Sequence, residues 1–525
     1  MPLVLVVLYI CLFNGLGALG LVGPDEPRYA AIARAMAETH DWITPRLWGT
    51  PWFEKPVLYY WTAGAAMRVF GVSEFAARLP SALAALLAVL AIAWTALRSY
   101  GIGAAWYALL MLPTSVAMIG FARAATPDML FAGLLTAAMA VASEMLQKPR
   151  PGPILRMAFG FFLGAAVLAK GPAAVILAGG ATLLWAALSR QWRASFRFLH
   201  PLIIAVFCVT ALPWYILCAL RNPDSLRVFI WQHNFQRYLT PVFEHRQPFW
   251  FFGPVLLLGI LPWLPLAATV LADAVRNWNS ETKMNSPSLF IAGWALFALL
   301  FFSISQSKLP GYILPAIPPV ILLLARSFVR QVELKPRVIQ SVVASIGIVF
   351  PVLIEIARAK LYPSFAPGLG LDLAPLRGVE LAFGVSLIFG ALIVVLALRH
   401  KWNGAIGVAT CTTVILILIA NRMVMPVLDS IVSARPAATS VIRSYAPKPD
   451  EVAVSHLPHA YWYGLNYYFQ KDLAEWTPRE EGTSFLFTSR EGLPQVSQFL
   501  LLHNSRAAAP IPATADGKIY FIDLR

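Results

Sequence analysis

Acidic and basic side chains stand next to long apolar segments of this chain, where charged groups are costly unless they face a cavity or a partner. Asp25 and Glu26 directly follow the first apolar run, and Glu54 and Lys55 lie later in the same polar segment. A carboxylate in this position can accept a proton from an attacking hydroxyl, or orient an acceptor that is already an anion. A lysine can hold a phosphate and stabilise the charge that builds on it when its bond to a sugar breaks.

Further charges can be grouped by their place in the chain. Once the apolar segments are oriented as membrane spans, several of these charges fall at outward span ends or in outward loops. They are Arg123, Asp128, Lys170, His233, Arg237, His245, Arg246 and Lys308. Among them Lys170, Arg237 and Lys308 are cations that could bind a phosphate together with Lys55. A shared site at the outer membrane interface is the simplest explanation of this one-sided distribution.

Structural roles compete with these functional ones. Pro27 suits the first position of a helix over 27–38, so Asp25 or Glu26 would then favour the N-terminus of that helix. Neighbouring helical positions point about 100° apart, so both acids are not expected in one site. Asp25 is the better candidate for chemistry. Lys170 and Lys308 could instead extend to lipid head groups.

Aromatic residues of the first polar segment could stack on a sugar or a polyprenyl chain, or form an interfacial belt. They are Trp48, Trp52, Tyr59, Tyr60 and Trp61. Metal binding has little support, because His456 and His459 in the tail, and His233, Glu244 and His245 in one loop, form no recognised ligand set. We predict no cofactor, and a divalent cation is possible without support from the sequence.

The composition is that of a membrane protein. Of 525 residues, 58% are hydrophobic and 13% are charged. The net charge of +15 comes from basic residues scattered in short loops, with no basic face interleaved with aromatic residues, so nucleic acid is not an expected partner. Windows of about 19 residues predict about 13 transmembrane helices. The predicted spans are 1–22, 76–98, 104–121, 127–147, 154–170, 172–189, 199–220, 249–270, 288–305, 310–329, 336–356, 379–398 and 403–425.

The short loops predict the orientation. Those near 98, 148–156, 190–197, 276–283, 326–337 and 399–401 are rich in Lys and Arg and are therefore expected to be cytoplasmic. The segments 23–75, 221–248 and 357–378 and the C-terminal tail then face outward. The tail shows strand-like runs at 451–457, 484–488 and 518–524 and a helical stretch at 492–503. We predict a transmembrane catalytic domain over 1–428, with the polar loop 23–75, and a small outward α/β domain over 429–525.

Several motifs together resemble a known family. The first loop carries Asp25-Glu26-Pro-Arg28-Tyr29-Ala, Asp41-Trp42-Ile-x-Pro45-Arg46-Leu and Phe53-Glu54-Lys55-Pro56, and later segments carry Asp128, Lys170-Gly171, Phe235-Gln236-Arg237-Tyr238, His245-Arg246-x-Pro248-Phe249-Trp250, Leu261-Pro262-Trp263 and Ser307-Lys308-Leu309-Pro310-Gly311-Tyr312. The set resembles the bacterial lipid A 4-amino-4-deoxy-L-arabinose transferases, relatives of the protein O-mannosyltransferases with the GT-C fold. Trp52, where the family commonly has Tyr, and a histidine shifted by one position at His233 depart from the pattern.

The resemblance implies residue roles. Asp25 matches an essential first-loop aspartate, Lys55 a phosphate-contacting lysine, Asp128 a second functional carboxylate and Tyr312 a donor-pocket tyrosine. The remaining motif positions match without a firm role: Arg28, Glu54, Lys170, Arg237, His245 and Lys308. Trp52 and Tyr60 complete the expected sugar pocket.

The sequence therefore predicts a polytopic glycosyltransferase of the bacterial inner membrane. It would move a sugar, such as 4-amino-4-deoxy-L-arabinose, from an undecaprenyl or other polyprenyl-phosphate donor to lipid A or another envelope acceptor, with its active site and C-terminus in the periplasm. A lipid or solute transporter is the alternative, although transporters usually place ionisable groups near the bilayer midplane. A third hypothesis is that the protein is a structural subunit of an envelope complex.

Overall fold

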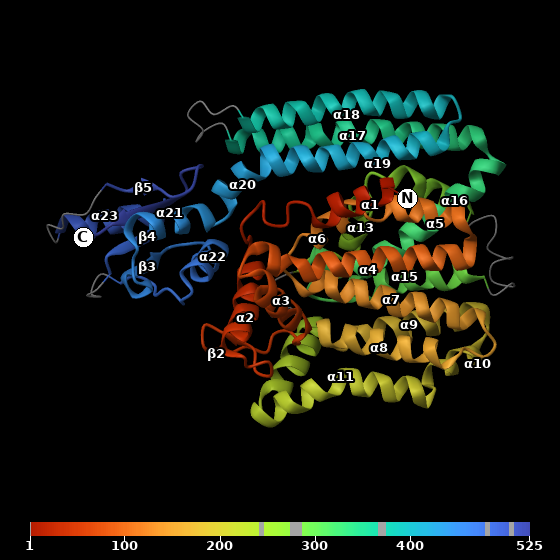
Figure 1. The fold of residues 1–525 in the computed structure, drawn as a ribbon, viewed down its shortest axis with the longest axis horizontal. Coiled ribbons are helices and arrows are strands. Elements are labelled where there is room, and N and C mark those ends of the chain that lie inside the picture. The colour runs from red at the N-terminus through yellow and green to blue at the C-terminus, as the bar shows by residue number, and fades with distance from the viewer. Residues whose placement is uncertain (1, 241–245, 274–285, 366–373, 478–482, 503–508) are drawn as a thin grey trace.

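The protein is an elongated bundle of helices with a small α/β domain at one end (Figure 1). The computed structural model describes residues 2–240, 246–273, 286–365, 374–477, 483–502 and 509–525. The apolar helices of the bundle run roughly side by side. Their bounds are α1 (Pro2–Leu8), α4 (Glu74–Tyr100), α5 (Ile102–Met111), α6 (Val116–Ala122), α7 (Pro127–Gln147), α8 (Pro153–Lys170), α9 (Ala173–Ser189), α11 (Pro201–Arg221), α13 (Phe252–Gly259), α15 (Pro287–Ile304), α16 (Ile317–Leu334), α17 (Pro336–Phe365), α18 (Ala374–Leu398) and α19 (Trp402–Ile419).

Within the described residues, nine helices are long and apolar enough to cross a membrane. Two bent helix pairs and two shorter apolar helices, Pro2–Phe13 and Ala173–Ser189, add to them. Every predicted span thus contains an apolar helix or a bent pair. The protein is a polytopic helical membrane protein, while the number of helices that cross the bilayer stays a prediction.

Three predicted spans differ in shape from the expectation. The span predicted over 1–22 is helical only to Phe13, because the chain turns at Gly15, which has a positive φ of 79°. The spans predicted over 104–121 and 249–270 are bent pairs, with angles of 59° and 113°. Pro113 and Pro262 lie at these breaks, where they cannot donate a helical hydrogen bond, and Pro265 lies at the start of the helix that follows the second break.

The two breaks pack against each other. The backbone N–H of Val116 donates to the carbonyl oxygen of Leu261 at 2.9 Å. The indole N–H of Trp263 donates to the hydroxyl of Thr114 at 3.1 Å. Backbone groups that the helices leave unpaired are thus satisfied inside the protein, as an apolar surrounding requires.

Helix α7 occupies the centre of the part of the bundle that bears the site. Its apolar length is buried throughout, and it packs between α4 and α8. At Gly133 a Cβ would collide with the carbonyl oxygen of Ala84 in α4, so glycine allows the two backbones to approach. Asp128 lies in the first turn of this central helix, which begins at Pro127.

The first polar loop folds into two helices and a hairpin at the end of the bundle that faces the C-terminal domain (Figure 1). These elements are α2 (Asp25–Thr39), the antiparallel strands β1 (Arg46–Leu47) and β2 (Thr50–Pro51), and α3 (Leu58–Phe70). Trp48 and Gly49 form the hairpin turn with positive φ values of 46° and 89°.

The C-terminal domain has both helices and a sheet, which confirms the predicted α/β class. Its sheet has the order β3-β4-β6-β5, in which β3 (Val452–Ser455) and β4 (Phe485–Ser489) are parallel, and β6 (Ile519–Asp523) is antiparallel to β4 and β5 (Ile511–Pro512). The flanking helices are α21 (Arg435–Tyr445), α22 (His459–Phe469) and α23 (Leu493–Leu502). The predicted boundary at 428/429 falls inside α20 (Met425–Val432) and stays a prediction.

Candidate active site

A chain of alternating charges connects the beginning of α2 with the segment before α3. The guanidinium of Arg28 pairs with Asp25 and lies 3.4 Å from the Glu54 carboxylate. Glu54 also accepts a hydrogen bond from the Lys55 ammonium at 2.9 Å. Burial acts to lower the pKa of Arg28, but Glu54, Tyr29 and Asp25 together outweigh it, so the pKa is raised and Arg28 stays a cation.

The two acids at the start of α2 have separate roles, as their helical spacing predicts. The helix begins at Asp25 rather than at Pro27, so both acids lie in its first turn. The Asp25 side chain is 44% exposed and pairs with Arg28. Glu26 is buried, and Arg78 donates to its two carboxylate oxygens at 3.0 and 2.7 Å.

Glu26 holds together segments that carry other candidate residues. Its carboxylate accepts hydrogen bonds from the backbone N–H groups of Val22 at 2.8 Å and of Ala125 at 2.6 Å. Arg78 in turn donates to the carbonyl oxygens of Leu16, Leu19 and Gly20. Glu26 therefore has a structural position, but not the one predicted, because its carboxylate binds neighbouring segments and does not cap its own helix.

Asp128 and Lys170 meet at the ends of two neighbouring helices. Asp128 lies at the N-terminus of α7 and Lys170 is the last residue of α8, positions where the helix dipoles favour an anion and a cation. Their side chains form an ion pair. The Lys170 ammonium also lies 4.5 Å from the ring centre of Tyr312.

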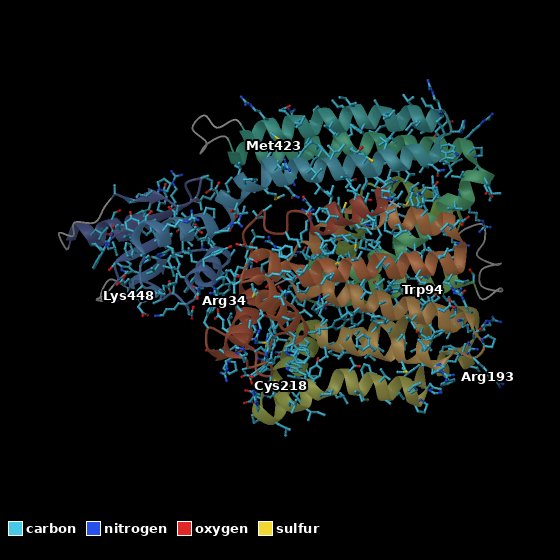
Figure 2. The ribbon with its side chains drawn as sticks, viewed as in Figure 1. Arg34, Trp94, Arg193, Cys218, Met423 and Lys448 are labelled. Atoms are coloured by element: carbon cyan, nitrogen blue, oxygen red, sulfur yellow. The ribbon has the colours of Figure 1, made fainter. Side chains whose placement is uncertain are left out.

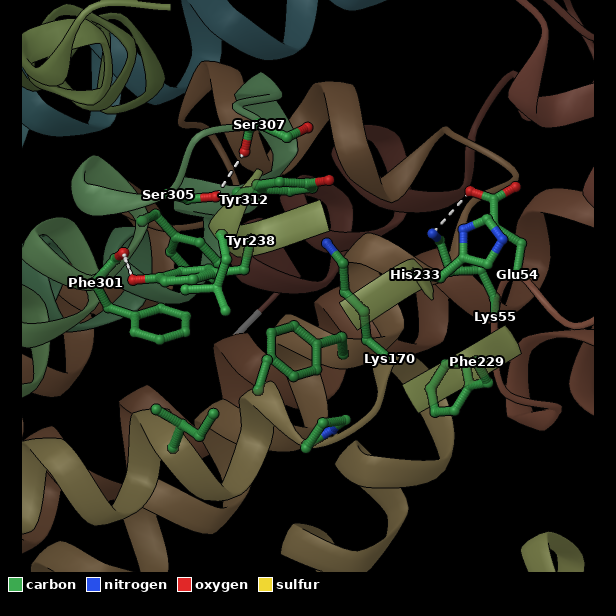
Figure 3. Close-up of a pocket in the computed structure, with 16 residues that line it drawn as sticks. Glu54, Lys55, Lys170, Phe229, His233, Tyr238, Phe301, Ser305, Ser307 and Tyr312 are labelled. Atoms are coloured by element: carbon green, nitrogen blue, oxygen red, sulfur yellow. Dashed lines mark hydrogen bonds and ion pairs between the residues drawn. The ribbon is translucent and has the colours of Figure 1, made fainter. Parts of the chain in front are cut away.

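The first-loop charges and this ion pair come together at one cavity of about 340 Å³. Figure 3 shows the Lys170 side chain extending between Tyr312 and the Glu54–Lys55 pair. The other lining residues are mostly apolar or aromatic. The lining comprises Glu54, Lys55, Phe131, Lys170, Pro172, Ala173, Ile176, Phe229, His233, Tyr238, Leu239, Phe301, Phe302, Ser305, Ser307 and Tyr312. The cavity therefore combines two ammonium groups with an apolar wall, which suits an amphipathic anion.

Some predicted site residues lie beside this cavity rather than in its lining. Asp25 and Arg28 adjoin it through Glu54, and Asp128 through Lys170. The indole ring of Trp52 lies 5.7 Å from the Arg28 guanidinium. Tyr60 packs against Tyr29 with ring centres 6.2 Å apart. Burial raises the pKa of Tyr60 well above its ordinary value, so its hydroxyl stays protonated.

Lys308 also lies next to the cavity. Its ammonium donates to the carbonyl oxygens of Gln247 at 3.1 Å and of Ser305 at 2.5 Å. Burial lowers the pKa of this lysine. The Lys308 ammonium therefore links the segments that contain Gln247 and Ser305. Its contact with a phosphate stays a prediction. The Arg237 side chain and all of His245 lie outside the described residues.

Several lining residues were not among the predicted site residues. The Tyr238 hydroxyl donates to the carbonyl oxygen of Phe301 at 2.8 Å, and the two rings stack with centres 4.9 Å apart. Phe301 and Phe302 come from the last turn of the apolar helix α15, where nothing in the spacing separates a cavity wall from a lipid-facing surface. Tyr238 stands directly after Arg237 in a motif that pointed to this region.

A metal centre is not evident in the described part of the chain. No group of three or more His, Cys, Asp or Glu side chains there could hold a metal ion. Because the Arg237 side chain and all of His245 lie outside the described residues, the expectation of a reaction without a metal stays a prediction.

The sequence matches known proteins along most of its length. Residues 1–229 match the model of the dolichyl-phosphate-mannose-protein mannosyltransferase family. An undecaprenyl phosphate-alpha-4-amino-4-deoxy-L-arabinose arabinosyl transferase of Edwardsiella ictaluri is 31% identical over 419 residues, which cover 78% of this chain and 73% of that protein. A second transferase of this name, from Sodalis glossinidius, is 36% identical over 58% of this chain and 55% of its own length.

Solved structures share the fold. The crystal structure of ArnT from Cupriavidus metallidurans bound to undecaprenyl phosphate aligns over 100% of this chain and 98% of that chain, with a TM-score of 0.81 and 24% identity. The archaeal oligosaccharyltransferase AglB from Archaeoglobus fulgidus aligns over 95% of this chain and 70% of its own, with a TM-score of 0.52 and 12% identity. The chain belongs to the family of the undecaprenyl phosphate-alpha-4-amino-4-deoxy-L-arabinose arabinosyl transferases, and it is a membrane glycosyltransferase with the GT-C fold.

Proposed function

We propose that this protein transfers 4-amino-4-deoxy-L-arabinose from undecaprenyl phosphate to lipid A, at the periplasmic face of the bacterial inner membrane. The observation that carries the proposal is the pairing of two lysines with an apolar cavity. Lys55 and Lys170 supply positive charge where the wall is otherwise formed largely by aromatic and aliphatic side chains. A polyprenyl phosphate has the matching chemistry, because its anionic head joins a long apolar chain.

The donor and the acceptor would approach from different sides. The donor phosphate binds between Lys55 and Lys170, with the start of its lipid chain along the wall that contains Phe301 and Phe302. Asp25 lies outside this lining and its side chain is 44% exposed, so it is open to an acceptor from the aqueous side. Arg28 and Glu54 connect the two positions.

The reaction would be a single displacement at the anomeric carbon, with inversion. An acceptor oxygen forms a bond to this carbon while the bond from the carbon to the phosphate oxygen breaks, and undecaprenyl phosphate leaves with the electron pair. Lys55 and Lys170 stabilise the charge that develops on the phosphate. A hydroxyl acceptor gives its proton to Asp25, whereas for an anionic acceptor no proton moves and the Asp25–Arg28 pair orients it.

Transfer can be tested with the purified full-length protein in vesicles. The vesicles would contain undecaprenyl-phosphate-linked aminoarabinose and lipid A, and mass spectrometry would follow both lipids. We expect lipid A to gain the mass of one aminoarabinose unit as the donor is converted to undecaprenyl phosphate. An unchanged lipid A, with hexose transferred from a matched hexosyl donor, would contradict the proposed sugar.

The transporter alternative predicts a different product. A transporter would move the lipid-linked sugar between leaflets and leave its covalent structure intact. Membership of a family of transferases supports transfer over transport. Appearance of free undecaprenyl phosphate only when the acceptor is present would distinguish transfer from both transport and simple hydrolysis.

A further inference from the structure

An aromatic residue of the C-terminal domain lies against the charged chain of the first loop. The Arg28 guanidinium carbon is 5.7 Å from the ring centre of Tyr463, which is part of α22. It is also 5.7 Å from the ring of Trp52 and 5.8 Å from that of Tyr29. Three aromatic rings therefore surround a guanidinium whose side chain is 16% exposed.

Tyr463 also contacts the hairpin that precedes Glu54 and Lys55. Its ring centre lies 5.4 Å from that of Trp48, at the tip of the hairpin. The indole nitrogen of Trp48 is buried without a hydrogen-bond partner among the described residues, so the Trp48 side chain is held by ring packing. The Arg46 guanidinium also donates to the Gly49 carbonyl oxygen across the turn at 3.2 Å. The hairpin closes through a hydrogen bond from the Trp52 N–H to the Pro45 carbonyl at 2.8 Å, directly before Glu54.

The helix that carries Tyr463 is fixed to the rest of the protein by polar contacts. The hydroxyl of Tyr468 donates to Glu74 at 2.8 Å and accepts from the N–H of Leu21 at 3.1 Å. Arg34 of α2 lies beside the backbone of Tyr467, at 3.5 Å from its carbonyl oxygen. These contacts at Tyr467 and Tyr468, in the turn of α22 that follows Tyr463, set the position of the Tyr463 ring relative to α2. Figure 2 shows Arg34 next to the C-terminal domain.

We propose that Tyr463 is a positioning residue for transfer, through which the C-terminal domain fixes the Arg28 guanidinium between Asp25 and Glu54. This inference rests on the proposed function. A planar guanidinium stacked among aromatic rings has fewer orientations in which to bind carboxylates. Without the Tyr463 ring, Arg28 and the hairpin tip lose a shared neighbour, and the acceptor side at Asp25 and the phosphate side at Lys55 lose their mutual alignment.

Substitutions at Tyr463 test this role. We expect Tyr463→Ala to lower kcat by about five- to thirty-fold, the range that loss of a partly desolvated cation–π contact implies. Tyr463→Phe keeps the ring and should stay within about two-fold of the unsubstituted enzyme. Tyr463→Leu keeps a branched apolar side chain without a ring and should resemble Tyr463→Ala. Tyr520→Ala, on β6 of the same domain, is the matched control and should retain activity.

A double-substitution cycle shows whether Tyr463 acts through Arg28. Arg28→Lys keeps the charge and removes the planar group. In that background, Tyr463→Ala should lower kcat by less than about two-fold further, because coupled residues are not additive. Undiminished kcat in Tyr463→Leu, or an equally large effect in both backgrounds, would overturn the proposal. Lack of transfer by the unsubstituted enzyme would instead contradict the proposed function.

Discussion

Each lysine that lines the cavity already has a carboxylate beside it. Lys55 pairs with Glu54 at 2.9 Å, and Lys170 pairs with Asp128. A bound phosphate would therefore add a second anion to each ammonium group and would weaken these pairs. Removal of either lysine takes away a cation from beside Glu54 or Asp128, close to the place where phosphate binds. The affinity for the donor should therefore fall by more than the loss of one phosphate contact implies.

The aspartate of the first loop gives the most direct test of the assigned roles. Asp25→Asn keeps the size of the side chain and removes its charge. Because a general base or orienting carboxylate contributes about 10²-fold or more, we expect transfer in vesicles to fall by at least that factor. Asp224→Asn is the control, since the Asp224 side chain is 79% exposed in an outward-predicted loop. Full activity of Asp25→Asn would show that Asp25 has no part in the reaction.

The lysine at the end of α8 should affect phosphate binding. Lys170→Gln removes the cation and should raise the inhibition constant of added undecaprenyl phosphate by about ten-fold or more, as loss of a charge-assisted contact implies. Lys148→Gln is a matched control, because Lys148 pairs with Glu144 at 3.0 Å near the other end of α7. Equal inhibition of Lys170→Gln and the unsubstituted enzyme would place the phosphate elsewhere.

At the scale of elements, the Glu26–Arg78 pair joins α2, α4 and the segment before α7. Both side chains are buried, and removal of one member of a buried pair costs about 3–5 kcal/mol. We therefore expect Arg78→Met to lower the free energy of unfolding by about this amount, seen as a lower thermal midpoint in detergent. Arg227→Met should change the midpoint little, because the Arg227–Asp224 pair is exposed. Equal midpoints for the two variants would contradict the role of the buried pair.

The sequence predicts helices better than their ends or bends. Apolar length predicts the helices of the bundle, and strand-like runs predict β3, β4 and β6, because burial and periodicity are local properties. α2 begins at Asp25 rather than at Pro27, and Glu26 in its first turn binds Arg78, which lies 52 positions later in the chain. The breaks at Thr114 and Leu261 are likewise stabilised by each other, which no single window of sequence contains.

Some residues of the site could be predicted from the sequence and others could not, again because only local patterns are visible in a sequence. Asp25, Glu54 and Lys55 stand in one short polar segment, so their type and spacing indicated a role. Tyr463 stands in an aromatic helix that resembles ordinary packing in the C-terminal domain. Its contact with Arg28 follows only from the way in which the domain meets the first loop.

At the scale of the whole molecule, the orientation predicted from the short basic loops can be tested at two exposed residues. Figure 2 places Lys448 in the C-terminal domain and Arg193 at the opposite end of the bundle. A membrane-impermeant maleimide added outside spheroplasts should label Lys448→Cys and leave Arg193→Cys unlabelled until the membrane is permeabilised. The unsubstituted protein is the blank, because all four native cysteines lie in apolar helices. If only Arg193→Cys were labelled from outside, the protein would have the opposite orientation to the one predicted.

The contacts between residues 17–20 and the start of the C-terminal domain join parts of the chain that are made at very different times. Asp429 accepts from the N–H of Gly20, 409 residues earlier, and Arg435 donates to the carbonyl oxygens of Gly17 and Ala18. A ribosome therefore makes the segment that carries Asp25 about 400 residues before it makes the residues that hold this segment. Contacts so distant in sequence form late, so a partly synthesised chain inserted in the membrane would not yet have an aligned site. Synthesis of the segment that contains Asp429 and Arg435 would then control when the enzyme first becomes able to act.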